Sequence, residues 1–338
     1  MTAAEDNPDP REVAWHPRRR GTLYGHGAAE ARLLRAVRSG KLHHAWLISG
    51  PRGIGKATLA YRFARFLMQF PDAGGRQTLQ VAPGTASARQ VAAGSHPDLL
   101  VVERAYDAKN KRIKSEIAVD DARLAGSFFA LTAGAGGWRA AIVDAADDLN
   151  GESANALLKI LEEPPPRSVF LVVAHRPGTL LRTIRSRCIH MELAPLNFDD
   201  TMRVLREVSP AVDGEQLRRA AELSGGSPGR ALELVDSKGA QAFANFLSKP
   251  KLTPAARIEI ANNFAGRDTG DFEIFCDLLV AWTAAKAREA GLAGGGAALA
   301  RAHDGIAHSI REANALNLDR RQTAVEALTL LDEALRAA

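Results

Sequence analysis

A glycine-rich loop between an apolar run and a helical pattern is the feature that most constrains the fold. The loop Gly50–Lys56 follows the apolar run Trp46–Ser49 and precedes the helix-period segment Ala57–Gln69. The spacing G-x-x-x-x-G-K lets backbone N–H groups surround a phosphate, aims the helix N-terminus at it and supplies a lysine. A strand before the loop and a helix after it distinguish a phosphate loop from an ordinary turn. The predicted nucleotide-binding residues of this loop are Gly50, Gly53, Gly55 and Lys56.

Short apolar runs alternate with helical patterns over the first 190 residues or so. The predicted strands are Trp46–Ser49, Leu99–Val102, Ala140–Val143 and Val169–Val173. Continuous rather than alternating apolarity is typical of strands buried on both faces, as in a parallel sheet covered by helices. The helical patterns around them are Glu30–Ser39, Ala57–Gln69, Asp120–Ala130 and Ser153–Glu163. The fold class predicted for this part is a layered α/β domain.

The remainder of the chain reads as helical. Residues 72–97 hold Gly, Pro and Ser without a clear period, so we interpret them as a loop or insertion. Short helical patterns follow Pro195, and four longer ones follow Pro254. We therefore predict an α/β domain over residues 1–195, a small helical domain over 196–244 and a helical bundle over 245–338.

Composition excludes several classes of protein. The chain is 46% apolar and 25% charged, as expected of a globular protein, and its formal charge of +5 is too small to mark a nucleic-acid binder by itself. Its two cysteines cannot form a disulfide framework. No run has the length of a membrane helix, and the acidic stretch Met1–Asp9 is unlike a signal peptide. We expect a cytoplasmic protein without a membrane partner.

Two parts of an ATP-hydrolysing site are missing. The position after the loop lysine, where a Ser or Thr hydroxyl binds Mg²⁺, is Ala57, and Thr58 is rotated away by about 100°. Asp144 ends an apolar strand and suits metal coordination, but the acid that follows it in such ATPases is here Ala145. We interpret Asp147 and Asp148 as solvated turn residues. Together these losses argue against hydrolysis.

Several further motifs, in order and spacing over residues 23–232, resemble the bacterial AAA+ clamp loader subunits of DNA polymerase III. The most specific are Asn155–Pro165 and Thr183–Cys188, and the approach to the phosphate loop, Leu42–Pro51, also matches. The remaining matches are Tyr24–His26, His96–Asp98 and Gly226–Leu232. The resemblance implies an AAA+ P-loop NTPase-like parallel sheet domain, a helical lid domain and an all-helical collar.

Within this family, a damaged ATP site beside an intact Ser-Arg-Cys resembles the stationary, non-hydrolysing type of subunit. The resemblance implies a subunit of a DNA-directed DNA polymerase holoenzyme, expected to lack intrinsic ATPase activity. Its partners would be motor subunits and a delta subunit in a five-subunit ring, and, through that complex, a sliding clamp and primer-template DNA. No cofactor is expected to be required, although ATP or ADP binding without hydrolysis is compatible with the retained Lys56 and Asp144.

The same resemblance gives roles to individual residues. Arg187 would be an arginine finger that acts on a neighbour's nucleotide, in an interface motif formed with Ser186 and Cys188. The alternative is an ordinary surface or salt-bridging arginine. Arg230 matches the position from which the helical domain senses nucleotide, and a first-turn helix residue is the equal alternative. Many members carry a four-cysteine zinc module where residues 72–97 lie, and these hold no cysteine. We therefore predict no zinc or other metal site.

Three more interpretations follow from the same residues. The position where active members carry a γ-phosphate-sensing Thr or Asn is Ala174, and we interpret His175 as a loop histidine. Two arginine clusters, Arg18–Arg20 and the set Arg32, Arg35 and Arg38, are expected to form solvated charged faces. The alternative for Arg18–Arg20 is contact with DNA phosphates or a neighbour's nucleotide. The alternative functions are an ATP-hydrolysing motor subunit of the same clamp loader, and a remodelling or helicase subunit, which should carry its own DNA-binding module.

Overall fold

The computed structural model describes most of the chain. The described residues are 13, 15–107, 109–131, 137–235, 237–249, 252–265 and 270–337. The acidic stretch Met1–Asp9 therefore lies outside them. The chain divides into two compact units, one formed by Met1–Val212 with Gly225–Gly229 and the other by Asp213–Ser224 with Arg230–Ala338. Each unit is described by itself.

A five-stranded parallel sheet forms the centre of the first unit, with the strands in the order β2-β5-β6-β1-β7. The strands of the sheet are β1 (Ala45–Ser49), β2 (Leu99–Glu103), β5 (Arg139–Asp144), β6 (Ser168–Ala174) and β7 (Ile189–Glu192). A separate antiparallel pair is formed by β3 (Tyr106–Asp107) and β4 (Arg112–Ile113). The parallel sheet predicted from the apolar runs is confirmed.

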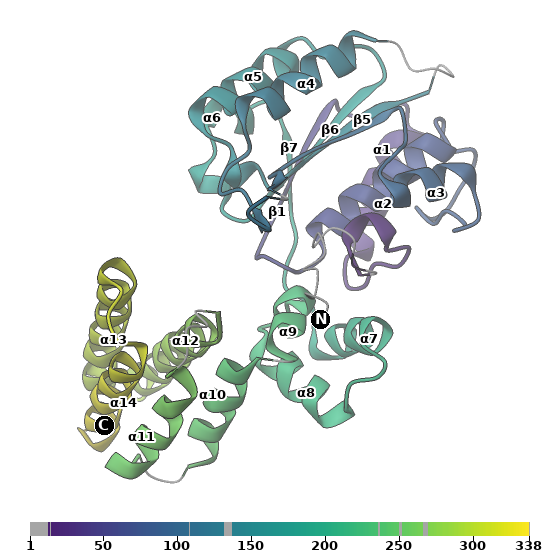
Figure 1. The fold of residues 1–338 in the computed structure, drawn as a ribbon. Helices are drawn as coiled ribbons and strands as arrows, with labels where there is room; N and C mark the ends of the chain where they lie inside the picture. Colours follow the sequence, from purple (N-terminus) through teal and green to yellow (C-terminus); the bar gives the residue numbers. More distant parts are fainter. Residues whose placement is uncertain are drawn as a thin grey trace, which may run out of the picture. The chain divides into compact units, whose positions relative to one another are not determined.

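Both faces of the central strands are buried, which is why their sequences are continuously apolar. On β1, Trp46 and Ile48 point into one apolar core, while Ala45 and Leu47 point into the other. Helices α1, α2 and α3 cover the first face, and α4, α5 and α6 cover the second (Figure 1). Their bounds are α1 Gly27–Arg38, α2 Lys56–Gln69, α3 Ala86–Ala93, α4 Val119–Ala130, α5 Gly151–Glu162 and α6 Arg182–Arg185. Short 3₁₀ helices span Pro17–Arg19, Ala146–Asp148 and Pro177–Thr179.

The structure differs from the sequence prediction in two places. Residues 72–97, interpreted as a loop, contain α3, which Thr85 caps at its N-terminus and Gly94 ends in a left-handed conformation. The edge strand β7 was not predicted, because it has only four residues and two of them, His190 and Glu192, are exposed. Its polar residues alternate with Ile189 and Met191, so β7 lacks the continuous apolar run that marks the other four strands.

The segment before α1 is tied to the rest of the first unit by buried arginines of α2. Arg62 binds Glu30 and the carbonyl oxygen of Gly21, and Arg65 donates to the carbonyl oxygens of Arg18 and Arg20 at 2.8 and 3.0 Å. These charge-assisted hydrogen bonds fix the backbone of the segment. They also give the buried guanidinium groups the partners without which burial would be costly.

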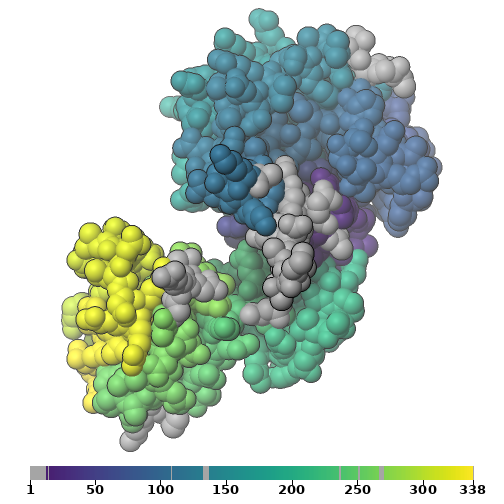
Figure 2. All heavy atoms as spheres, viewed as in Figure 1, coloured from purple at the N-terminus to yellow at the C-terminus, as the bar shows by residue number. Residues whose placement is uncertain are grey.

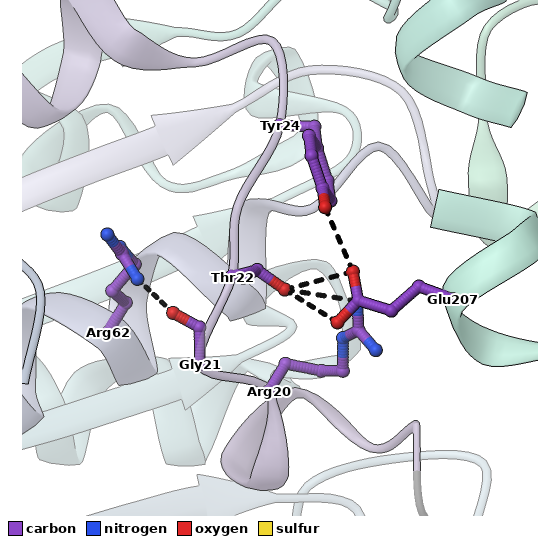
Figure 3. Close-up of polar contacts among 6 residues, drawn as sticks. All are labelled: Arg20, Gly21, Thr22, Tyr24, Arg62 and Glu207. Carbon is purple, nitrogen blue, oxygen red and sulfur yellow. Dashed lines mark hydrogen bonds and ion pairs between the residues drawn. The ribbon is translucent and has the colours of Figure 1, made fainter. Parts of the chain in front are cut away.

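The same segment also reaches α7 (Phe198–Val208). Glu207 of α7 accepts hydrogen bonds from the hydroxyls of Thr22 and Tyr24 at 2.9 and 3.1 Å and pairs with Arg20 at 3.0 Å (Figure 3). The pKa of the Tyr24 hydroxyl is raised, first by burial and second by the hydrogen bond to the Glu207 carboxylate. The interpretation of Arg20 as a solvated arginine is therefore wrong, because it is ion-paired.

The second unit is helical throughout its described residues. Its elements are α8 (Gly214–Leu223), most of α9 (Pro228–Val235), α10 (Lys238–Ser248), α11 (Pro254–Ala261), a 3₁₀ turn (Asn262–Phe264), α12 (Gly270–Leu292), α13 (Ala297–Leu316) and α14 (Arg320–Ala337). The last two pack along each other (yellow in Figure 2). The predicted boundary at 244/245 falls inside α10, so the three-domain division stays a prediction beside the two units observed.

Candidate nucleotide loop and arginine turn

The phosphate-loop residues lie between β1 and α2, at the carboxyl edge of the sheet where ligands bind in α/β folds. Gly50, Gly53 and Gly55 all have positive φ, at 138°, 77° and 103°. A side chain at Gly50 would stand 2.3 Å from the carbonyl oxygen of Leu193. The backbone path of the loop therefore requires glycine, as the motif predicts.

The loop lysine is folded back onto its own loop. Lys56 is 3% exposed, and its Nζ donates to the carbonyl oxygens of Gly50 at 2.7 Å and Pro51 at 2.5 Å. Burial lowers the pKa of Lys56 to about 8, although the carboxylates of Asp144 and Asp147 oppose that shift. A phosphate would have to compete with these two carbonyls for the ammonium group.

Three further loop carbonyls are held by groups from elsewhere in the first unit. The Oγ of Ser227 donates to Arg52 O at 2.7 Å, and the amide of Gly229 donates to Gly53 O at 2.9 Å. From the other side, Nε2 of the buried His26 donates to Ile54 O at 2.8 Å. The loop backbone is thus fixed at successive residues by a histidine and by the Gly-Ser-Pro-Gly segment.

The metal-binding side of the site lacks its usual ligands. Ala57, the second residue of α2, offers no hydroxyl, and the side chain of Ala145 is buried. Asp144 lies at the end of β5, where burial and the charge of Glu103 raise its pKa to about 6 despite the nearby Lys56. A carboxyl that is partly protonated near neutral pH is a weaker cation ligand than an ordinary aspartate.

Asp147 is not a solvated turn residue, contrary to our interpretation. Its carboxylate accepts hydrogen bonds from the backbone amides of His175 at 2.5 Å and Arg176 at 2.7 Å, just after β6. Asp148 pairs with Arg104 at 3.0 Å. Asp147 therefore joins the end of β5 to the end of β6, and only the tertiary structure brings these positions together.

His175 also has a more specific environment than a loop histidine. Burial and the charge of Lys56 lower its pKa to about 4. Its Nδ1 is buried and has no hydrogen-bond partner among the described residues. A neutral imidazole therefore follows Ala174, the position where an active ATPase would carry a hydroxyl or amide.

Arg187 lies just after the short helix α6. Its Nη2 forms an ion pair with Oε1 of Glu162 at 2.6 Å, and its Nη1 donates to the carbonyl oxygen of Thr183 at 3.0 Å. One third of the side chain, 33%, is exposed. The guanidinium is thus held in one orientation and still faces solvent.

Residues 183–188, which we call the arginine turn, contain Arg187, and its two neighbours Ser186 and Cys188 have structural roles. Ser186 ends α6, and its Oγ donates to Thr183 O at 3.1 Å. Cys188 packs against the apolar core beneath α5 and α6, and burial raises the pKa of its thiol to about 12. A thiol with that pKa is unreactive near neutral pH, so Cys188 acts as a small apolar anchor.

The remaining sequence candidate is Arg230. It is a half-buried residue of α9 and belongs to the second unit, so its relation to the phosphate loop stays a prediction. Among the described residues no cluster of His, Cys, Asp or Glu is suited to a metal ion. In the same part of the chain no helix combines the length and apolarity needed to cross a bilayer.

Comparison with known proteins assigns these features to a family. The family model described as DNA polymerase III, delta subunit matches residues 25–197. The chain belongs to this family. The matched region contains β1 to β7, the phosphate loop and the arginine turn, so the family suggested by the sequence motifs is confirmed.

Several curated relatives that are similar to this chain bear the name delta-prime, and others bear the names gamma and tau. The chain is similar to DNA polymerase III subunit delta' of Pseudomonas aeruginosa, with 38% identity over 187 residues, 55% of this chain and 53% of the relative. Similarity to the Escherichia coli subunit delta' is 35% over 213 residues, 62% of this chain and 60% of the relative. The match to Escherichia coli subunit tau is 28% over 226 residues, 66% of this chain and 33% of the relative. The chain thus spans little more than half the length of its delta-prime relatives.

Several contacts of this DNA polymerase III family member that join distant segments were not predicted. These are Asp147 with the β6 end, Ser227 and Gly229 with the loop, His26 with Ile54, and Glu162 with Arg187. Each joins segments at least 25 residues apart. Several of the residues in these contacts lie within motifs that carry the family resemblance, among them His26, Ser227, Gly229 and Glu162. Asp147 lies in none of these motifs, so no sequence signal pointed to it.

Proposed function

We propose that this chain is a delta-prime subunit that organises a DNA polymerase III clamp loader without hydrolysing ATP. In this proposal it sits in a five-subunit ring with motor subunits and a delta subunit, and the ring loads a sliding clamp onto primed DNA. The observation that carries the proposal is the combination, in one chain, of an oriented and exposed Arg187 with a phosphate loop followed by Ala57.

The state of the chain's own nucleotide loop supports the absence of hydrolysis. Mg²⁺ would have no hydroxyl ligand at Ala57, and no acid at Ala145 would polarise a water molecule. Lys56 is occupied by two loop carbonyls. The glycine backbone still suits a phosphate, so binding of ATP or ADP without turnover is part of the proposal, and no cofactor is required for the organising role.

The environment of Arg187 supports a role on a neighbouring subunit. A guanidinium is permanently charged and binds phosphate through two parallel N–H bonds, which neutralises charge in the transition state of phosphoryl transfer. An arginine supplied in this way is worth about 10³–10⁵ in rate in well-studied nucleotide hydrolases. Ser186 shapes the turn and Cys188 anchors it, so both contribute to the proposed interface by positioning Arg187.

The test is ATP hydrolysis by the reconstituted ring with DNA and clamp present. We would use rings in which only the motor subunit beside this chain can hydrolyse ATP, and compare wild type with Arg187→Ala. The expected result is a loss of at least about 10-fold in kcat. Arg206→Ala, which removes an exposed arginine of α7, is the matched control and should leave the rate unchanged. An unchanged rate with Arg187→Ala would remove the finger assignment.

A second arm separates this proposal from an ATP-hydrolysing motor subunit of the same loader. The isolated chain should show no ATPase activity that depends on Lys56. Activity that is present in wild type and abolished by Lys56→Ala would instead identify the chain as a motor subunit, despite Ala57 and Ala145.

A further inference from the structure

A glutamate at the end of α5 holds the arginine of the turn. Oε1 of Glu162 lies 2.6 Å from Nη2 of Arg187, and the carbonyl oxygen of Thr183 accepts from Nη1 at 3.0 Å. The two acceptors come from different elements, α5 and α6. A planar guanidinium bound on two of its nitrogens by two fixed acceptors has a defined plane as well as a defined position.

The backbones that carry both acceptors are fixed because α5 and α6 pack on one core. Leu161, next to Glu162, and Ile184, within the turn of Thr183, are each 2% exposed and belong to the same apolar cluster. Pro164 and Pro165 end α5 directly after Glu163, because proline cannot continue a helix. Glu162 is thereby fixed as the last residue of α5.

The ion pair contributes little to the stability of the fold. The side chains of Arg187 and Glu162 are 33% and 49% exposed, and pairs this accessible to water are weak because solvent screens both charges. A weak surface pair between two otherwise rigid elements still selects one rotamer of a long, flexible side chain. Its effect is therefore on where Arg187 points.

We propose that Glu162 is a positioning residue for Arg187, which orients the guanidinium so that its remaining N–H donors face a neighbouring subunit's nucleotide. This inference rests on the proposed function of Arg187. It would explain the presence of Glu162 in the Asn155–Pro165 motif. The side chain of the adjacent Glu163 is exposed and forms no hydrogen bond or ion pair with any described residue. It is therefore the matched control for a substitution of Glu162.

The test uses the same reconstituted rings and measures kcat and KM for ATP separately. Glu162→Ala should lower kcat about 5- to 10-fold and leave KM within about twofold, because ATP binding belongs to the neighbour and only the finger's orientation is lost. Glu162→Gln should recover most of the rate, since its amide oxygen still accepts from Nη2. Glu163→Ala should match wild type, and the melting temperatures of all variants should agree.

The double variant Glu162→Ala with Arg187→Ala should be no slower than Arg187→Ala alone, because Glu162 acts through Arg187. A wild-type or higher rate with Glu162→Ala, or an additive loss in the double variant, would overturn the positioning role. If rings with Arg187→Ala hydrolyse ATP at the wild-type rate, both the finger role of Arg187 and the positioning role of Glu162 are contradicted. If the rate is low with Arg187→Ala and normal with Glu162→Ala, only the positioning role of Glu162 is contradicted.

Discussion

The amide nitrogen of Gly229 donates a hydrogen bond of 2.9 Å to the carbonyl oxygen of Gly53, and the two backbones touch without intervening side chains. A methyl group placed on Gly229 would lie 2.8 Å from Cα of Gly53. The first turn of α9 thus packs directly on the phosphate loop. Together with Ser227 on Arg52 and His26 on Ile54, this contact holds the loop in one shape.

Gly229→Ala is expected to destabilise the first unit by about 1–3 kcal/mol, because backbone atoms rather than a flexible side chain must move. Chemical denaturation followed by circular dichroism measures the change. Gly151→Ala is the control: no atom lies within 4 Å of the added methyl group, and alanine at this helix start should change stability by less than about 1 kcal/mol. Equal stability of the two variants would contradict the close packing.

Asp147→Ala is expected to cost about 2–4 kcal/mol of unfolding free energy. The substitution removes the charged acceptor of two backbone amides, those of His175 and Arg176, and leaves both without a partner. Asp148→Ala removes only a partly exposed ion pair with Arg104 and should cost about 0–1 kcal/mol. Thermal melts of the two variants at equal protein concentration test the difference, and comparable losses would show that Asp147 has no special role.

Asp144 makes stability depend on pH. Its pKa is raised to about 6 in the folded chain, so between about pH 4 and pH 6 the folded state binds more protons than the unfolded state. Stability from this group is therefore present below about pH 4 and lost as the pH rises through 6. Asp144→Asn should lack this loss, and its stability relative to wild type should rise by up to about 3 kcal/mol across that window.

Denaturation curves at pH 4, 5, 6 and 7 measure the effect of Asp144. Asp199→Asn, which alters an exposed carboxylate at the start of α7, is the control. Its difference in unfolding free energy from wild type should be the same at all four pH values. A constant difference between Asp144→Asn and wild type at all four pH values would mean that the carboxyl is not perturbed in solution.

Local patterns were sufficient to predict the parallel sheet and the phosphate loop. The central strands β1, β5 and β6 are buried on both faces, so each is marked by uninterrupted apolar residues that do not depend on knowing the neighbour. Gly50 and Lys56 occur at the spacing that is typical of a phosphate loop between a strand and a helix. The absent hydroxyl at Ala57 is equally a local fact.

Two short elements of the first unit, β7 and α3, could not be predicted in this way. The strand β7 is half exposed, and α3 is an eight-residue helix rich in alanine, so neither has a long apolar period. Both are stabilised by what they pack against: β1 pairs with β7, and α2 packs on α3. Tertiary contacts override weak local preference in such short segments.

The sequence by itself determined the parallel sheet without β7, the family, and the missing hydroxyl and acid at Ala57 and Ala145, because each of these depends on residues close together in the chain. Only the tertiary structure decided which polar groups meet: Lys56 with its own loop carbonyls, Asp147 with the end of β6, and Glu162 with Arg187. The physical reason is that a hydrogen bond or ion pair depends on ångström distances between side chains. Folding sets those distances for residues far apart in sequence, and no periodic pattern records them.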